Sequence, residues 1–249
     1  MRVKDIIDRV TLMYHDETYW RMNQKQYLQL LDDAILQTIL LRPDAHEKRE
    51  IIKLDPGTRQ RLPKGAYTLI DIYANKFYID SLDIYTDGKP IYQVARKSLD
   101  YFSNWYSAQE ESNEINEFAY DVRTPKDYWV NPPVGNTVPV YVEIGYSYSC
   151  EQYSEMEDDY EEILEMEIPI SNEFRNALVS YMLYLCYSTD STSQFDRQIA
   201  DKYLQNFYQS LNLEYTVGVT MTSRIKEFTT QGIGVHTDEP ATIEQINKQ

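Results

Sequence analysis

Apolar residues at the start of the chain recur at steps of three and four positions, the period of one face of an α-helix. This first set is Val3, Ile6, Ile7, Val10, Met13 and Tyr14. A second helix is expected to begin after Asn23, whose side chain can cap free N–H groups together with Gln26 three residues on. Its stripe is Tyr27, Leu28, Leu31, Ala34, Ile35 and Ile39. Pro43 ends this helix, so the opening residues predict a helical hairpin.

The pattern changes to short strands and turns after the second helix. Ile51–Leu54 is expected to form a strand that returns as Arg59–Leu62 through the turn signal Asp55-Pro56-Gly57. A further hairpin is expected over Ile84–Tyr92, because Asp87-Gly88 tolerates the positive φ angles of tight turns. Both segments predict antiparallel pairs that are local in sequence.

Val138–Tyr148 is the clearest strand, because apolar residues occupy every second position. Phe118–Val122 and Tyr128–Val130 are expected to be its neighbours. Leu69–Ile79 is rich in β-branched and aromatic residues, although helix and strand both remain open for it. A short helix is expected over Val94–Ser107. The middle of the chain is therefore predicted to be a small, mostly antiparallel β region.

Helical periodicity returns at Ser171, a residue type that commonly caps helices. The apolar stripe that follows is Phe174, Ala177, Leu178, Tyr181, Met182 and Leu185. Ser193 and Asp196 fit the capping pattern of a last helix. The buried side expected for that helix is Ile199, Tyr203, Leu204, Phe207 and Leu211. After Leu213 apolar residues are sparse, so the tail is expected to be disordered or to be ordered by lying on a partner.

The order of elements predicts an α+β protein. Helices from both ends of the chain are expected to form one bundle, from which the β region projects as an insertion. The expected units are an N-terminal helical hairpin (1–48), a β-rich insertion with an acidic loop at 151–167 (49–170), a C-terminal helix pair (171–213) and an extended arm (214–249).

Charge and composition narrow the classes of function. The chain has 40 Asp and Glu against 24 Lys and Arg, a net charge of −16, which argues against simple binding of nucleic acid. The negative charge is compatible with a protein that surrounds DNA without binding it tightly, since a negatively charged wall repels phosphate. The 23 tyrosines either lie at the edges of the core or provide extensive protein–protein interfaces, where Tyr is enriched.

Targeting signals and disulfides are not indicated. No stretch of 18 or more apolar residues occurs, and residues 1–5 contain no apolar signal core, so neither a membrane span nor secretion is expected. Cys150 and Cys186 are therefore expected to be reduced thiols.

No pattern typical of catalysis or of cofactor binding is present. His15, His46 and His236 lack ligand-spaced partners, and no phosphate loop or nucleophile elbow occurs. The chain is therefore predicted to be no enzyme and to need no cofactor or metal. An acidic run could attract a divalent cation, but it lacks the glycine and regular spacing of a calcium loop, which favours a solvated, repelling loop. Its candidate residues are Glu157, Asp158, Asp159, Glu161 and Glu162.

Four segments together resemble the head-to-tail adaptor (connector) proteins of tailed bacteriophages, especially short-tailed ones. Leu41–Ala45 is followed by the turn-and-strand phrase Gly57–Pro63. Asp121–Pro133 carries an aromatic pair before a double proline, and Tyr181–Asp190 is similar to the penultimate helix and its exit. The resemblance rests on the order and spacing of these segments and spans roughly residues 1–213.

The resemblance implies a non-enzymatic virion protein at the capsid–tail junction, made in the cytoplasm of the host bacterium. It implies a ring, commonly of twelve copies, that binds the portal protein, presents a platform to a tail nozzle or tail tube protein, and continues the channel for double-stranded DNA without binding DNA specifically. It implies no cofactor and no membrane. The arm is expected to bind the portal through Ile225, Phe228, Ile233 and Val235. The long acidic run and the long arm depart from the family pattern.

Two alternatives remain. Another tail or nozzle subunit is one, although a mainly β chain would suit it better than these helical ends. An acidic protein that mimics DNA is the other, although nine of the acidic residues are concentrated within residues 151–167 rather than spread over a face.

Overall fold

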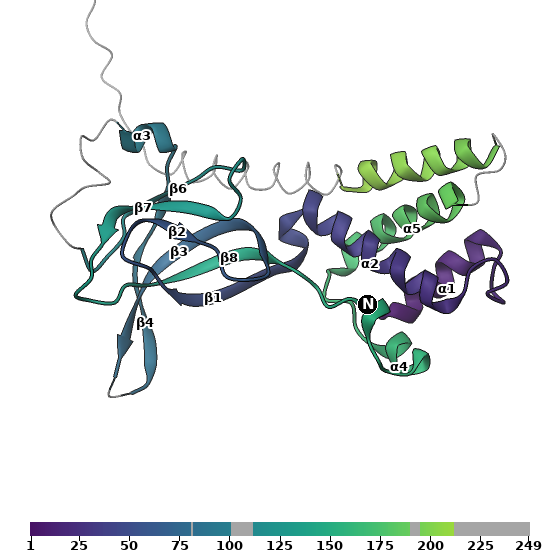
Figure 1. Ribbon diagram of the computed structural model, residues 1–249, viewed down its shortest axis with the longest axis horizontal. Helices are drawn as coiled ribbons and strands as arrows, with labels where there is room; N and C mark the ends of the chain where they lie inside the picture. Colours follow the sequence, from purple (N-terminus) through teal and green to yellow (C-terminus); the bar gives the residue numbers. More distant parts are fainter. Residues whose placement is uncertain (81, 101–111, 190–194, 212–249) are drawn as a thin grey trace, which may run out of the picture.

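The computed structural model describes residues 1–80, 82–100, 112–189 and 195–211. It is an α+β structure in which the strands and the short helix α3 (Arg96–Asp100) lie on one side and the other helices on the opposite side (Figure 1). The predicted arm at 214–249 therefore lies outside the described residues. The helices of the helical side are α1 (Val3–Tyr14), α2 (Gln24–Leu41), α4 (Tyr160–Glu165), α5 (Arg175–Thr189) and the helix over residues 195–211. None of the helices in these ranges is long and apolar enough to cross a membrane.

The two helices predicted at the N-terminus are present as α1 and α2. Asn23 accepts a hydrogen bond from the Gln26 backbone N–H (2.9 Å), and the Gln26 side chain accepts one from the Asn23 N–H (2.8 Å), which closes the capping box of α2. After α2, Pro43 begins the 3₁₀ turn η1 (Pro43–His46). Local signals therefore set both ends of α2.

The helices share one core that joins the N-terminal helices to the helices over residues 175–211. It contains α1 and α2 residues such as Ile7 and Leu31, α5 residues such as Leu178, and Phe207 from the last described helix. In Figure 1 the helix over residues 195–211 lies alongside α5, and the rings of Tyr181 and Phe207 are 4.8 Å apart. Ser171 precedes a 3₁₀ turn, η3 (Asn172–Phe174), and makes no side-chain cap, so this cap prediction is wrong: its hydroxyl donates to Glu173 instead.

Two four-stranded sheets pack through a second core. The first has the order β1-β8-β3-β4 and the second β2-β7-β6-β5; all pairs are antiparallel except β5–β6. Ile72, Ile144 and Val130 are among the residues through which the inner faces meet. The strands are β1 (Glu47–Lys53), β2 (Gly57–Arg61), β3 (Ala66–Ile79), β4 (Ile84–Pro90), β5 (Tyr92–Gln93), β6 (Glu117–Tyr120), β7 (Asp127–Val134) and β8 (Tyr141–Tyr148).

Both hairpins predicted from turn signals are wrong in their pairing. β1 pairs with β8, and β2 pairs with β7, so the turn at Gly57 carries the chain from one sheet to the other. Buried Gln60 braces this turn by donating to the Asp55 carbonyl (2.6 Å) and accepting from its N–H (2.8 Å). The Asp87-Gly88 pair lies inside β4 instead of at a turn.

Gly88 is needed for close packing. A Cβ atom at this position would lie 2.7 Å from the ring of Phe77 on β3. The β3–β4 hairpin turns between Ile79 and Ile84, which pair with each other, and Asp83 before Ile84 has a φ of 53°. The segment left open between helix and strand is the long strand β3.

Three further predictions are partly wrong. β8 begins at Tyr141, and Val138 is 43% exposed, although Val142, Ile144 and Tyr146 are buried as expected. β6 and β7 pair with each other in the second sheet, not with β8, whose neighbours are β1 and β3. The helix expected over Val94–Ser107 is described only as α3 (Arg96–Asp100), and the rest of it lies outside the described residues.

Candidate interaction surfaces

The acidic segment (residues 151–167) is docked on the helices and is not a free loop, while its candidate carboxylates are exposed to solvent as predicted. The Val3 N–H donates to the Met166 carbonyl (3.0 Å), and the Ile168 N–H donates to the Met1 carbonyl (2.8 Å). Arg2 adds an ion pair with Glu165 (2.7 Å). The N-terminus and the end of the segment thus lie together like two short strands, and this pairing was not visible from local sequence.

A second anchor holds the beginning of the segment to α2. The Asp32 carboxylate accepts hydrogen bonds from the backbone N–H groups of Tyr153 and Ser154, each at 2.9 Å. These residues open the 3₁₀ turn η2 (Tyr153–Glu155). The buried Tyr153 hydroxyl donates to the Glu167 carbonyl (2.9 Å) and ties the two ends of the segment together.

The acidic residues occupy the outer side of this docked segment. Asp159 caps α4 by accepting from the Tyr160 N–H (2.9 Å), while Ile163 and Leu164 enter the helical core. Within the described ranges no group of three or more acidic, His or Cys residues could hold a metal ion. The five candidate carboxylates predicted from the sequence are all exposed: Glu157, Asp158, Asp159, Glu161 and Glu162.

An open groove of about 490 Å³ lies where the acidic segment leaves β8, and we call it the waist groove. His46 and Cys150 line it, 104 positions apart in sequence, with His46 Nδ1 3.3 Å from Cys150 Sγ. Burial raises the pKa of the Cys150 thiol to about 12, so the thiol stays protonated and is no nucleophile near neutral pH. The lining is His46, Tyr148, Ser149, Cys150, Glu151, Tyr153, Met156, Met166, Glu167 and Pro169.

The loop between α1 and α2 is fixed around one buried carboxylate, Asp16, which is 2% exposed. Asp16 accepts from the backbone N–H groups of Trp20 (2.7 Å), Arg21 (3.0 Å) and Met22 (3.1 Å), and from the Tyr27 hydroxyl (2.9 Å). Burial alone would raise the pKa of Asp16, but these hydrogen bonds outweigh burial and lower it. The carboxylate therefore holds the loop as an anion.

The β3–β4 hairpin projects from the first sheet and carries an aromatic cluster (Figure 1). The rings of Tyr78 and Tyr85 are 5.1 Å apart, and those of Tyr85 and Tyr141 are 5.4 Å apart. Tyr78 donates to Asp83 (2.6 Å), which fixes the ring beside the turn. Phe77 and Ile84 are also exposed on the hairpin, so this part of the tyrosine excess lies on the surface.

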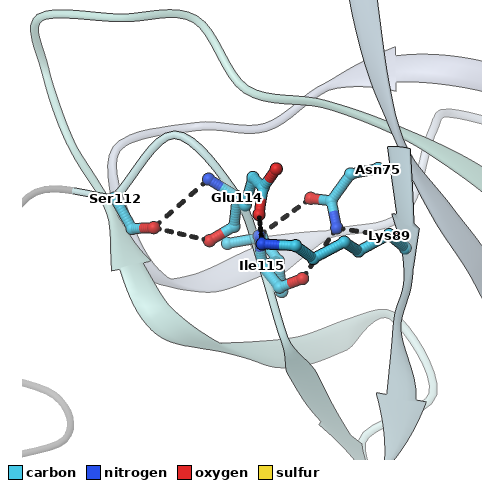
Figure 2. Close-up of polar contacts among 5 residues, drawn as sticks. All are labelled: Asn75, Lys89, Ser112, Glu114 and Ile115. Carbon is cyan, nitrogen blue, oxygen red and sulfur yellow. Dashed lines mark hydrogen bonds and ion pairs between the residues drawn. The ribbon is translucent and has the colours of Figure 1, made fainter. Parts of the chain in front are cut away.

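A buried amide organises the base of the same hairpin. Figure 2 shows Asn75 donating to the carbonyls of Lys89 (3.0 Å) and Ile115 (2.8 Å) and accepting from the Ile115 N–H (2.8 Å). The β3–β4 register is irregular at Asn75, so its side chain supplies the bonds that regular pairing would have made. The ammonium of Lys89 contacts Glu114 (2.6 Å) outside this buried centre.

Comparison with known protein families identifies the family of this chain. Residues 1–226 match the family described as SU10 adaptor protein. The chain belongs to the SU10 adaptor protein family. No curated protein gives a significant match. The resemblance to phage head-to-tail adaptors is confirmed, and the chain is a structural adaptor of the virion.

The adaptor's surfaces differ from the site residues predicted from sequence. The exposed carboxylates lie together on the acidic segment, whereas Ile225, Phe228, Ile233 and Val235 lie outside the described residues. Sequence reasoning missed the waist groove because its residues come from η1, β8 and the acidic segment. It also missed the aromatic hairpin, although Tyr78 and Tyr85 flank Asp83 in the sequence.

The described chain of the adaptor ends beside η1. The Arg42 guanidinium donates to the Leu211 carbonyl (3.0 Å) and also bonds the Asp44 carboxylate (2.7 Å). Arg42 belongs to the segment Leu41–Ala45 that supported the family resemblance. Its side chain therefore fixes the last described residue, Leu211, beside η1.

Proposed function

We propose that this adaptor forms a closed ring, of twelve copies as in the resemblance, that joins the portal to the tail and continues the DNA channel. Membership of the SU10 adaptor protein family over residues 1–226 carries this proposal. The role is non-enzymatic and needs no cofactor. The protein is made in the host cytoplasm and functions at the capsid–tail junction.

Different parts of the chain make different contacts in the assembly. The helices from both chain ends act as one bundle and form the body of the ring, and the β region projects from it toward the tail. The exposed Tyr78–Tyr85 hairpin suits a contact with a nozzle or tube protein, because tyrosines provide large contact areas at low entropic cost. The arm at 214–249 binds the portal through its sparse apolar residues.

The acidic segment contributes electrostatics. Five carboxylates on its outer side repel DNA phosphates, so DNA passes a wall of this kind without binding to it. Its docking on α1 and α2 through Val3 and Asp32 keeps these charges in one place. This role places the acidic segment on the channel side of the ring.

Mass measurement by light scattering tests the ring. The full chain is measured alone and after mixing with the portal protein of the same phage. We expect a discrete high-mass complex with the portal, even if the chain alone stays monomeric, because adaptor assembly can await the portal. A chain that never joins a portal complex at high concentration would contradict the proposal. The alternatives, another tail subunit or an acidic DNA mimic, would then be favoured.

Truncation after Leu213 tests the arm. The shortened chain keeps every helix and strand described above, so its circular dichroism and unfolding midpoint should match those of the full chain. Its binding to the portal should be lost. Normal portal binding by the truncated chain would refute the role of the arm while leaving the ring untouched.

A further inference from the structure

The α1–α2 loop presents a single large apolar side chain. Trp20 is 87% exposed, the most exposed of the large apolar residues in the described ranges, and Leu12, at 57%, is exposed on the neighbouring helix. The Trp20 backbone is not free to move, because its N–H is bonded to the buried Asp16 carboxylate at 2.7 Å. Tryptophan held in this way loses little entropy on binding and is enriched among residues that dominate interfaces.

The waist groove offers the complementary shape and chemistry. Its volume of about 490 Å³ is open to solvent and lined by apolar and aromatic groups that include Tyr148, Met156 and Met166. Methionine side chains adapt to a flat aromatic ring and make favourable sulfur–aromatic contacts. The groove is therefore suited to an indole.

Charge matches as well. Arg21 and Lys25 are exposed and follow Trp20 in the sequence, while the loop before Trp20 carries the exposed Glu17 and the buried Asp16 anion. Glu151 and Glu167 are exposed at the groove, where His46 is bonded to the Tyr148 carbonyl. Neither glutamate has an ion-pair partner among the described residues. The exposed cations that follow Trp20 are therefore complementary to the two carboxylates at the groove, which favours this pairing over one between identical surfaces.

One copy of the chain cannot make this contact by itself. Trp20 precedes α2, and His46 of the waist groove follows it. Trp20 and the groove therefore lie toward opposite ends of an 18-residue helix, about 27 Å long. In Figure 1 the α1–α2 loop lies at the far end of the helical side, and η1 lies where it meets the sheets. A contact between two different surfaces of one chain is heterologous and closes into a ring when the rotation permits.

We propose that Trp20 of each copy inserts into the waist groove of the next copy, with Lys25 facing Glu151. This contact rests on the proposed ring and supplies its repeating interface. The partner is a second copy of this chain.

Site-specific cross-linking tests the contact directly. The full chain carrying p-benzoylphenylalanine in place of Trp20 is assembled with the portal, irradiated and mapped by mass spectrometry. We expect intermolecular links to residues 148–156 or 166–169. Rings that form without links to these residues would overturn this inference but leave the proposed function standing. The absence of any ring from the unmodified chain assembled in parallel would overturn both.

Matched variants give a quantitative test. Trp20→Ala should raise the concentration for half-assembly about thirtyfold, the equivalent of losing one interface hot spot. Tyr92→Ala removes a comparably exposed aromatic, 65% exposed on β5, and should leave assembly unchanged. Equal effects of the two variants would contradict the proposal. Both residues are exposed, so each variant is expected to fold, and the unfolding midpoint checks this.

Charge reversal tests the orientation. Lys25→Glu and Glu151→Lys should each weaken assembly severalfold, and the double variant should recover most of the loss. Lys25 lies in the first turn of α2, where glutamate is favoured by the helix dipole, so the fold is preserved. Losses that merely add in the double variant would contradict a direct contact between these two residues.

Discussion

The helical side and the sheets of this adaptor differ in how far apart in sequence the residues lie that determine their structure. α2 begins and ends at residues that act within one turn, Asn23 with Gln26 and then Pro43. The sheets instead join strands that are far apart, with Glu50 of β1 opposite Ile144 of β8. Helix limits therefore follow from nearby residues, whereas strand partners follow from which faces can be buried together.

Core truncation in each half should have the largest effect on stability. Leu178 on α5 and Ile144 on β8 are both fully buried. Replacing either by alanine should lower the free energy of unfolding by about 2–5 kcal/mol, through lost burial and the cavity left behind. Urea unfolding followed by circular dichroism measures this, with Leu12→Ala, at an exposed leucine, as the control expected to change little.

This pair of variants also tests whether the two sides unfold together. A single transition in both variants would mean that helices and sheets unfold as one unit. A change confined to one of two transitions would sharpen the contrast between the sides. No loss of stability in either variant would contradict the packing described for that core.

The buried carboxylate of the helical side should come next. Asp16→Asn keeps the shape but weakens hydrogen bonds that an anion accepts, and should cost about 1–3 kcal/mol. The folded-state pKa of Asp16 is lowered, so its contribution is present above the unfolded pKa, about 3.9, and is lost as pH falls through the folded pKa. Unfolding measured between pH 7 and pH 2 should show a smaller decrease on acidification in Asp16→Asn. An identical pH dependence in the two proteins would contradict this role.

The sheet side has its own polar centre with a nearby control. Asn75→Ala removes three hydrogen bonds and leaves the Ile115 N–H without its partner, so about 1–3 kcal/mol should be lost. Lys89→Ala removes an exposed ion pair with Glu114 and should cost less than about 1 kcal/mol. Thermal unfolding of the two variants measures the difference. Equal costs would mean that Asn75 does not organise the hairpin base.

Much of the helical side could be predicted from sequence, because its periodicity and caps are local. The docking of the acidic segment was not predicted. Its nine acidic residues indicated a solvated loop, but Ile163 and Leu164 are buried and pack α4 against the helical core. The prediction relied on the acidic composition of the segment, whereas these two apolar residues determine that it packs on the helices. Ser171 failed as a cap because the chain enters α5 through a 3₁₀ turn.

The sheets could be predicted as strands but not as partners. The Asp-Gly pair at Asp87 is a hairpin signal in isolation, yet Gly88 serves a close approach of Phe77 inside β4. The waist groove has no sequence signal at all, since His46 and Cys150 meet only in the fold. Trp20 was visible in the sequence, but its exposure and its anchoring by Asp16 required the structure.

Electron microscopy of the full chain assembled with its portal protein tests the central claim most directly. The account predicts a closed ring of adaptor copies, coaxial with the portal, in which the α1–α2 loop of each copy meets the waist groove of the next. Portal particles that bind adaptor copies singly, or that carry no adaptor at saturating concentration, would contradict it.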